Sequence, residues 1–386
     1  MKKSLNKFIK YISSLIPKKS KGLHDPYFNG NEKKYLANCI KSGYVSSVGK
    51  YVNIFEKKVA KLTNVKFSVA TNSGTSALHL LMKYYNVGPK DEVLLPSLTY
   101  VATANAIKYC NSNLNFIEID KNNLGVCPNR LETYLKKIAK KKKHYYINKK
   151  SRKRLKLLIA VHLYGFSCDI EKLKKVCKKY KIILIEDAAE AFGSKFNGKY
   201  LGTFAEAGIF SFNGNKPITC GSGGMIVTNS EKIAKKTYHL SVQAKKRGLK
   251  EHDHDEIGFN YRMSNLSAAV GCAQLENFSK IFKAKRKNYK LYTTKLKQFS
   301  LVKILKEPRN SISNYWLIIA LFQNKKIKNF VFKKLRSKGF ICRSIWRPLH
   351  HLKIFQNSSR DKLSNTDEIF SKSLNLPSSP SITLKN

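Results

Sequence analysis

Short apolar runs alternate with helical patterns from residue 67 to residue 211, and this alternation restricts the possible folds more than any other feature of the chain. The apolar runs begin at Phe67, Val93, Asn115, Leu157, Ile182 and Ile209, and helical patterns follow Gly74, Val101, Pro128 and Asp169. Strands separated by helices in this way form a mostly parallel sheet that is covered on both faces. The sequence therefore predicts a large α/β domain.

The rest of the chain has a different pattern. A helical segment from about residue 265 to residue 296 leads away from the predicted sheet, and a strand-like run at 316–322 and a helix-like run at 326–338 follow it. This pattern predicts a smaller α+β domain, and 386 residues are enough for two cores. The expected divisions are a basic extension over 1–22, a large domain over 23–260, and the long helix with the small domain over 261–386.

Lys216 stands in the stretch SFNGNKPITCGSGG, where apolar residues and glycines surround it. A lysine amine attacks a carbonyl only when part of it is deprotonated, which requires burial or neighbouring cations. The flanks of Lys216 suit that requirement. A lysine in a glycine-rich loop of a basic chain is otherwise a solvated surface charge, so this residue alone does not establish a catalytic site.

Two further stretches offer partners for this lysine. A strand-like run at 182–185 ends in Glu186 and Asp187, and ligands of open α/β sheets gather beyond the carboxyl ends of strands. Residues 72–76, Asn-Ser-Gly-Thr-Ser, lie between a strand pattern and a helix pattern, where free N–H groups hold an anion, and Ser211 adds a hydroxyl. Alone, the aspartate is equally a helix N-cap and the turn an ordinary connection. Together they match the lysine, acid and phosphate cradle that pyridoxal phosphate (PLP) enzymes need.

Six motifs in one order make the pattern specific: ATNSGTSALHL, DEVLLPSLTYVATANAI, HLYGFSCDIEKL, IEDAAEAFGS, SFNGNK with GSGGMIVT, and GFNYRMSNLSAAVGCAQLE. In these motifs the chain resembles the DegT/StrS family of PLP-dependent nucleotide-sugar aminotransferases, from about residue 29 to about residue 377. VSSVGKYV and the last motif resemble most the branch that aminates keto-sugars on the path to legionaminic acid. The resemblance implies the type I PLP aminotransferase fold.

The resemblance also implies roles for individual residues. Lys216 forms the Schiff base with PLP, Asp187 pairs with the ring nitrogen, and Tyr100 stacks on the ring, although a core aromatic is the better interpretation of Tyr100 by itself. Glu190 is expected near the ring hydroxyl, where many relatives carry Gln or His. The remaining cofactor contacts implied are Ser73, Gly74, Thr75, Ser211, Asn213 and, from a neighbouring subunit, Asn260. A homodimer with shared active sites follows from that last assignment.

The same resemblance implies the reaction. An amino acid, for which glutamate is the expected donor, gives its amino group to a keto-sugar nucleotide in surface-glycan biosynthesis, and Lys216 acts both as anchor and as proton shuttle. A UDP-linked 4-keto-6-deoxy-N-acetylhexosamine is the expected acceptor, with GDP-perosamine synthesis as the alternative. A sugar dehydratase of the same fold carries His in place of the lysine. The candidate substrate contacts are His162, Tyr164, Arg262, Trp346 and His350, beside Arg343 and Arg347.

The net charge of +50, from 74 Lys and Arg against 24 Asp and Glu, raises the alternative of a polyanion-binding protein. A coding bias toward lysine explains the charge better, because lysines occur in nearly every predicted helix. The run from Lys136 to Lys156 is expected to be a lengthened, solvated surface loop, although the aromatics Tyr145 and Tyr146 within it leave room for nucleic-acid contact. No nucleic-acid partner is expected.

The first 22 residues place Phe8, Ile12 and Leu15 on one helical face. This segment either lies on an anionic membrane surface or packs on the protein as an added helix, and it matches neither a signal peptide nor a membrane span. The eight cysteines form no CxxC pair, so the sequence predicts no metal site and indicates reduced thiols in a cytoplasmic protein. The chain stops at SSPSITLKN, where the family is expected to continue into a last helix.

Overall fold

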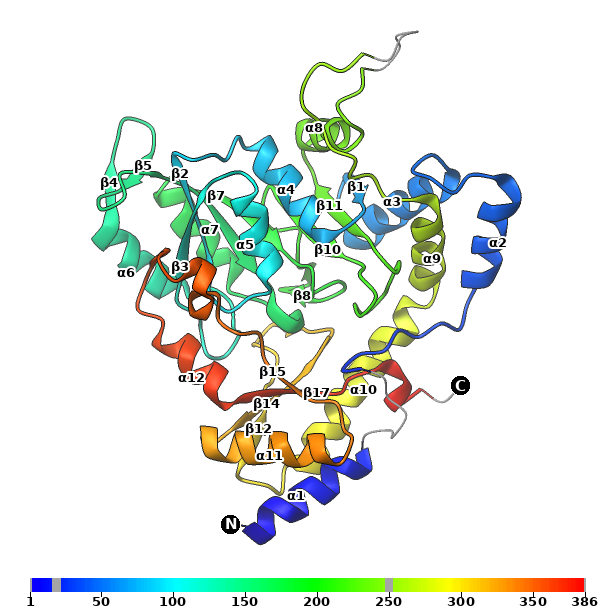
Figure 1. The fold of residues 1–386 in the computed structure, drawn as a ribbon, viewed down its shortest axis with the longest axis vertical. Helices are drawn as coiled ribbons and strands as arrows, with labels where there is room; N and C mark the ends of the chain where they lie inside the picture. Colours follow the sequence, from blue (N-terminus) through cyan, green and yellow to red (C-terminus); the bar gives the residue numbers. More distant parts are fainter. Residues whose placement is uncertain (1, 16–21, 247–252, 385–386) are drawn as a thin grey trace.

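The computed structural model describes residues 2–15, 22–246 and 253–384, and a large mixed sheet dominates it (Figure 1). The strands in spatial order are β1 (Phe67–Thr71), β11 (Gly224–Thr228), β10 (Ala207–Ser211), β7 (Ile183–Asp187), β6 (Arg154–Val161), β2 (Asp91–Pro96), β3 (Asn113–Ile117) and β16 (Ser359–Arg360). From β10 to β16 every pairing is parallel, and β11 is antiparallel to both of its neighbours. The predicted mostly parallel α/β sheet is confirmed.

Successive residues of each central strand belong to different cores, because side chains alternate between the two faces of a sheet. Leu157 packs into one apolar cluster and Leu158 into the other. Helices α4 (Gly74–Tyr84) and α5 (Val101–Lys108) pack into the first cluster, and α3 (Lys50–Thr63), α6 (Pro128–Ile138), α7 (Ile170–Lys179) and α9 (Asn265–Glu276) into the second. The large sheet is therefore covered on both faces, as predicted.

Helix α2 (Glu32–Ser42) packs on α9, and α8 (Glu231–Ser241) packs on α4 and β1. The predicted helical segment from 265 to 296 forms two helices, because Asn277 ends α9 and precedes α10 (Phe278–Leu296). Since α9 still packs against α2 and α3, the expected boundary at residue 261 divides elements that contact one another.

A smaller antiparallel sheet lies at the other end of α10. Its strands in order are β12 (Val302–Ile304), β14 (Ile318–Phe322), β17 (Ser373–Leu376) and β15 (Arg343–Ser344), and α11 (Lys325–Ser337) and α12 (Ser364–Lys372) pack on it. A third sheet orders β13 (Ser311–Ile312), β8 (Lys195–Phe196) and β9 (Lys199–Tyr200). Single turns of 3₁₀ helix are η1 (Leu163–Gly165), η2 (Leu349–His351), η3 (Lys353–Phe355) and η4 (Pro380–Ile382).

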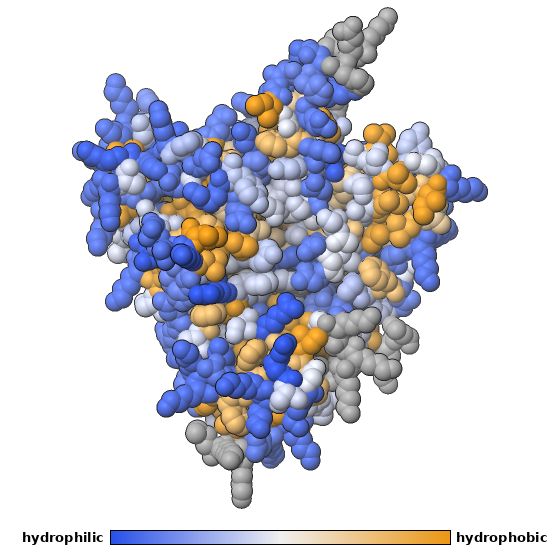
Figure 2. All heavy atoms as spheres, viewed as in Figure 1, coloured by the Kyte–Doolittle hydropathy of each residue, from blue (hydrophilic) through white to orange (hydrophobic). Residues whose placement is uncertain are grey.

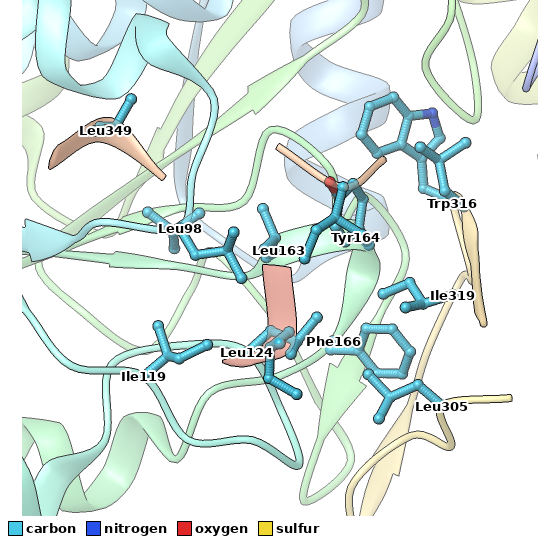
Figure 3. Close-up of a cluster of buried hydrophobic side chains, with 14 of the residues drawn as sticks. Leu98, Ile119, Leu124, Leu163, Tyr164, Phe166, Leu305, Trp316, Ile319 and Leu349 are labelled. Atoms are coloured by element: carbon cyan, nitrogen blue, oxygen red, sulfur yellow. The ribbon is translucent and has the colours of Figure 1, made fainter. Parts of the chain in front are cut away.

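A continuous apolar core joins the two parts of the chain (Figure 3). Leu163 and Phe166 follow the large sheet, and Leu305 and Ile319 come from the small part, yet all four are buried in one cluster. This shared core fixes the small part beside the carboxyl ends of the large sheet's strands.

Helix α1 (Lys2–Leu15) packs on the small part through its apolar face. The ring of Phe8 is fully buried, with ring centroids 5.4 Å from Phe299 and 6.0 Å from Phe322, and Ile12 is also fully buried. Of the two expectations for this segment, the added helix is therefore right, and the membrane-surface helix is wrong because its apolar face is already covered. No helix within the described ranges is long and apolar enough to cross a membrane.

The expectation of a solvated loop from Lys136 to Lys156 is wrong in part. Strands β4 (Ala139–Lys141) and β5 (Tyr146–Asn148) form a hairpin whose second strand pairs with β6. Lys156 lies within β6, is buried, and places its ammonium nitrogen 3.0 Å from Asp91 Oδ2. The lysine-rich surroundings hid this hairpin, because each strand has only three residues and β4 carries two exposed lysines.

Candidate active site

A cleft of about 430 Å³ lies at the carboxyl ends of β7 and β10, beside the small part of the chain. Nine of the predicted cofactor residues line it: Ser73, Gly74, Thr75, Tyr100, Asp187, Glu190, Ser211, Asn213 and Lys216. They come from four segments of the large part that are far apart in sequence. The topology brings them together because parallel strands end at one edge of the sheet.

Lys216 lies in the loop between β10 and β11, and its side chain is almost entirely buried in the cleft wall. Its Nζ lies 3.7 Å from Glu190 Oε1 and 3.9 Å from the ring centroid of Trp316. Burial lowers the pKa of Lys216 below its usual value, and the carboxylates of Glu190 and Asp187 only partly oppose that shift. A larger fraction of Lys216 side chains is therefore deprotonated than of surface lysines, and only the deprotonated amine attacks a carbonyl.

Asp187 ends β7 and turns its carboxylate into the cleft floor. Its Oδ2 accepts a hydrogen bond of 2.8 Å from Thr103 Oγ1, and its Oδ1 accepts one of 3.1 Å from the backbone N–H of Ala189. Burial raises the pKa of Asp187, while these two donors and the charges of Lys216 and His162 favour the carboxylate. This environment suits a carboxylate that accepts a hydrogen bond from a protonated ligand atom.

The start of α4 forms an anion cradle at the opposite wall. The Ser73 side chain caps the helix by accepting from Ser76 N, and no acceptor within the described residues receives the N–H groups of Gly74 and Thr75. A Cβ on Gly74 would lie 3.1 Å from Ser211 Cβ, so glycine at this position allows the start of α4 to lie close to β10 without crowding Ser211. Free N–H groups at a helix N-terminus beside a serine hydroxyl suit a phosphate.

Glu190 joins the two parts of the site. Its Oε1 accepts from the indole Nε1 of Trp346 at 3.1 Å, and its Oε2 accepts from the backbone N–H of Tyr164 at 2.8 Å. Burial raises the pKa of Glu190, and Lys216 opposes that shift most strongly. Glu190 therefore orients the lysine as well as the aromatic wall.

The structure separates the five candidate substrate residues. Only Trp346 lines the cleft. Tyr164 lies behind it, fully buried, where its hydroxyl accepts from the backbone N–H of Trp346 at 2.9 Å. Tyr164 thus positions Trp346 and Glu190, and its predicted substrate contact stays a prediction.

His162, Arg262 and His350 also lie outside the cleft lining. His162 is fully buried with its Nε2 2.9 Å from Glu186 Oε2, so it is a core residue behind Asp187. Arg262 makes a two-pronged ion pair with Glu56 and also donates to the carbonyl of Ala70, so its guanidinium is already paired within the large part. His350 contacts Ser97 Oγ through its Nδ1 at 2.7 Å. Acids elsewhere in the chain, Glu186 and Glu56, pair with the first two, and the local sequence does not reveal those pairs.

Asn260 is exposed and does not line the cleft of its own chain. Its backbone carbonyl accepts from Asn72 Nδ2 at 3.3 Å, beside the anion cradle. Its predicted contact, in the site of a neighbouring subunit, stays a prediction.

Thr103 and Trp316 are among the cleft residues that the sequence did not predict. Thr103 lies one turn after Tyr100 in α5, within a motif already singled out, and its spacing could have placed it in the cleft. Trp316 comes from the small part, where nothing nearby in sequence points to a ligand. Tyr100 is half exposed with its ring 4.9 Å from that of Trp346, so it is not a core aromatic.

A model of the DegT/DnrJ/EryC1/StrS aminotransferase family matches residues 26–386. The chain belongs to this family. It is therefore an aminotransferase, and the resemblance seen in the six motifs is confirmed. The legionaminic-acid branch is not confirmed and stays a prediction.

Individual relatives in this aminotransferase family can be compared over almost the whole chain. A GDP-perosamine synthase of Vibrio cholerae is 38% identical over 363 residues, which cover 93% of this chain and 94% of that protein. A UDP-4-amino-4,6-dideoxy-N-acetyl-beta-L-altrosamine transaminase of Campylobacter jejuni is 29% identical over 88% of this chain and 87% of that protein. The solved structure of Helicobacter pylori PseC aligns with a TM-score of 0.82 at 24% identity, covering 92% and 93% of the two chains.

Aminotransferases of this family depend on PLP, and the cleft fits that cofactor in three separate ways. It offers a buried amine with a lowered pKa, a carboxylate at the end of a strand, and free N–H groups for a phosphate. These are the groups that the aldehyde, the ring nitrogen and the phosphate of PLP require.

Proposed function

We propose that this protein binds PLP at the cleft and transfers an amino group from an amino acid, with glutamate as the expected donor, to a nucleotide-linked keto-sugar. The observation that carries the proposal is the placement of Lys216, Asp187 and the start of α4 around one cavity. When bound, PLP supplies an electron sink through which an amino group leaves a donor and reaches a keto carbon. The family and the names of its members support the sugar substrate.

The residues of the chain divide the work. Lys216 would hold the cofactor aldehyde, and its free amine would act as the base that takes the proton from the donor α carbon and then as the acid that gives this proton up. Asp187 keeps the ring nitrogen protonated, assisted by Thr103. The N–H groups of Gly74 and Thr75 hold the phosphate. Glu190 Oε1 lies 3.7 Å from Lys216 Nζ and restricts the positions that the lysine nitrogen takes.

A GDP-linked keto-sugar is the acceptor that we favour, with GDP-perosamine as the product. The relative named for GDP-perosamine synthesis is 38% identical, against 29% for the relative named for a UDP-linked sugar. The preference therefore changes from the UDP-linked sugar expected from the motifs to the alternative. A comparison of purified protein with GDP-linked and UDP-linked 4-keto-6-deoxy sugars tests it, and faster turnover of the UDP-linked sugar would contradict it.

A homodimer completes the proposal. Apolar side chains gather on the surface over α2 and α3 (Figure 2), and the exposed residues there include Ile40, Tyr44 and Val48. An apolar patch of this kind on an otherwise lysine-rich surface suits a second copy of the chain. Val48→Asp is expected to give monomers in light scattering and to weaken PLP binding, because Asn260 is proposed to act across the interface. Monomers that bind PLP with full affinity would exclude a shared site.

Absorbance of the purified protein with PLP tests the central proposal. We expect the visible band of lysine-bound cofactor in the wild type, its conversion by glutamate, and no such band in Lys216→Ala. Lys199→Ala, which changes an exposed lysine, is the matched control and keeps the band. A band that glutamate leaves unchanged, together with loss of oxygen from the sugar, would indicate the dehydratase instead.

A further inference from the structure

Two adjacent histidines and one aspartate converge outside the cleft. His350 and His351 form the end of η2, and Asp367 lies in the first turn of α12. His350 Nε2 lies 3.2 Å and His351 Nε2 lies 2.9 Å from the same atom, Asp367 Oδ1. One ligand atom from each of the three side chains lies within 4.8 Å of the other two.

We propose that His350, His351 and Asp367 bind a divalent transition-metal ion, and that Zn²⁺ is the ion their donor set favours. Zinc binds imidazole nitrogen and carboxylate oxygen at about 2.1 Å, which places neighbouring ligand atoms about 3.4 Å apart in a tetrahedral site. The two contacts with Asp367 Oδ1 are close to that separation. Ca²⁺ and Mg²⁺ prefer ligand sets made of oxygen alone, so two nitrogens and one oxygen disfavour both ions.

The ring of His350 is already oriented for this role. Its Nδ1 lies 2.7 Å from Ser97 Oγ, and Ser97 Oγ also accepts from the backbone N–H of His350 at 3.2 Å. Ser97 is fully buried, so the contact holds the ring with Nε2 toward Asp367. A metal-bound histidine needs such a partner at its second nitrogen, which fixes the ring and its tautomer.

The two imidazole rings lie with centroids 4.2 Å apart, and both direct Nε2 toward Asp367 Oδ1. Two imidazole nitrogens and a carboxylate oxygen that face one point are the donor set of a metal site.

Solvent can supply the remaining coordination position. The side chain of His350 is 10% exposed, that of His351 is 34% exposed and that of Asp367 is 49% exposed, so one side of the cluster faces water. A bound ion would link η2 to α12. Because Trp346 lies four residues before His350, the ion would brace the segment that carries the aromatic wall of the cleft.

A second cluster, of His239, Asp255 and Glu256, serves as a comparison. There the ammonium group of Lys236 already pairs with Glu256, so a cation occupies the carboxylate that a metal would need. The sequence predicted a substrate contact at His350 and no metal site there, because two adjacent histidines followed by an aspartate in the next helix match no zinc-motif spacing.

Titration of the untagged protein, loaded with PLP, with Co²⁺ and Zn²⁺ tests the proposal. We expect one equivalent of Co²⁺ to bind with visible d–d absorption, Zn²⁺ to displace it, and Zn²⁺ to raise the melting temperature. His351→Gln and Asp367→Asn each change an accessible side chain and are expected to weaken binding at least tenfold. Ser97→Ala is expected to weaken it about tenfold through the loss of ring orientation.

His239→Gln and His144→Gln are the matched controls, and both are expected to keep the wild-type affinity and spectrum. Absence of saturable binding in the wild type would overturn the proposal. So would binding that survives both His351→Gln and Asp367→Asn, or binding that His239→Gln abolishes. None of these results depends on transaminase activity.

Discussion

The ammonium nitrogen of Lys216 lies over the indole face of Trp316, 3.9 Å from the ring centroid, although the two residues belong to different parts of the chain. Trp316 is itself fixed, because its Nε1 donates to the carbonyl of Asn215 at 2.6 Å and its ring is buried. The large part therefore carries the proposed catalytic lysine, and the small part determines where its nitrogen lies.

Replacement of the Trp316 indole should lower the reaction rate that depends on Lys216 more than it lowers the stability of the fold. Trp316→Phe keeps an aromatic face but loses the bond to Asn215 and part of the cation–π attraction, which is about 1–2 kcal/mol at a desolvated site. We expect the rate of the glutamate half-reaction to fall about tenfold, measured by stopped-flow absorbance. Phe204→Leu, at an aromatic residue away from the cleft, is the control. An unchanged rate with Trp316→Phe would show that Trp316 does not position Lys216.

Thr103→Val removes the hydroxyl that donates to Asp187 at 2.8 Å and changes little in volume. This hydrogen bond favours the carboxylate, so its loss should raise the already raised pKa of Asp187 further. A hydrogen bond to a charged group is typically about 1.5 kcal/mol, which corresponds to about one pH unit.

The measurement for Thr103→Val is the pH dependence of the glutamate half-reaction. The acid limb should move to higher pH by about one unit, because Asp187 must be ionised to hold a protonated ring nitrogen. Thr63→Val removes a buried hydroxyl in α3 that donates to Val59 O, and its profile should match the wild type. A Thr103→Val profile with an unshifted acid limb would exclude the assigned role of Thr103.

Phe8→Ala tests the docking of α1. The Phe8 ring is fully buried against Phe299 and Phe322, and removal of a buried phenylalanine side chain costs about 3–5 kcal/mol. We expect a loss of this size in the free energy of unfolding in urea. Lys10→Ala, on the exposed face of the same helix, should leave stability nearly unchanged. Equal stability of Phe8→Ala and wild type would mean that α1 does not pack on the small part in solution.

Local patterns predicted the elements that build the cleft floor. Lys216, Asp187 and the start of α4 each stand at the end of a strand that is apolar enough to identify, and the parallel topology then requires them to meet. The sequence could therefore predict these three residues in one site before any contact was known.

Contacts between distant segments could not be predicted in the same way. His162 and Arg262 looked like ligand residues because their partners, Glu186 and Glu56, lie elsewhere in the chain. Trp316 was missed because its only connection with the cleft is tertiary. The β4–β5 hairpin was missed because its strands have three residues each and stand in a lysine-rich stretch, so pairing with β6 rather than composition determines their conformation.

Lys285 provides the last test, because it is a fully buried lysine and no carboxylate among the described residues pairs with it. Its Nζ donates to Trp316 O at 2.7 Å, Ser378 O at 2.6 Å and Ser378 Oγ at 2.8 Å. Burial lowers the pKa of Lys285 well below its usual value, so between the folded and unfolded pKa values the unfolded chain binds more protons. Stability should therefore rise with pH in that window, by up to about 1.4 kcal/mol per unit from this group.

Lys285→Met removes the titrating group and should remove that part of the pH dependence, while the carbonyl of Trp316 keeps a hydrogen bond of 2.6 Å from Ser378 Oγ. The measurement is urea unfolding of wild type and variant at neutral and alkaline pH. The unfolding free energy of the wild type minus that of the variant should rise with pH. Only the wild type gains stability from this group, because only its unfolded chain loses the extra proton as the pH rises. A difference that is constant with pH would show that Lys285 stays charged in the fold, held by its three oxygen acceptors. In that case the same oxygens, rather than loss of the proton, would offset the cost of its burial.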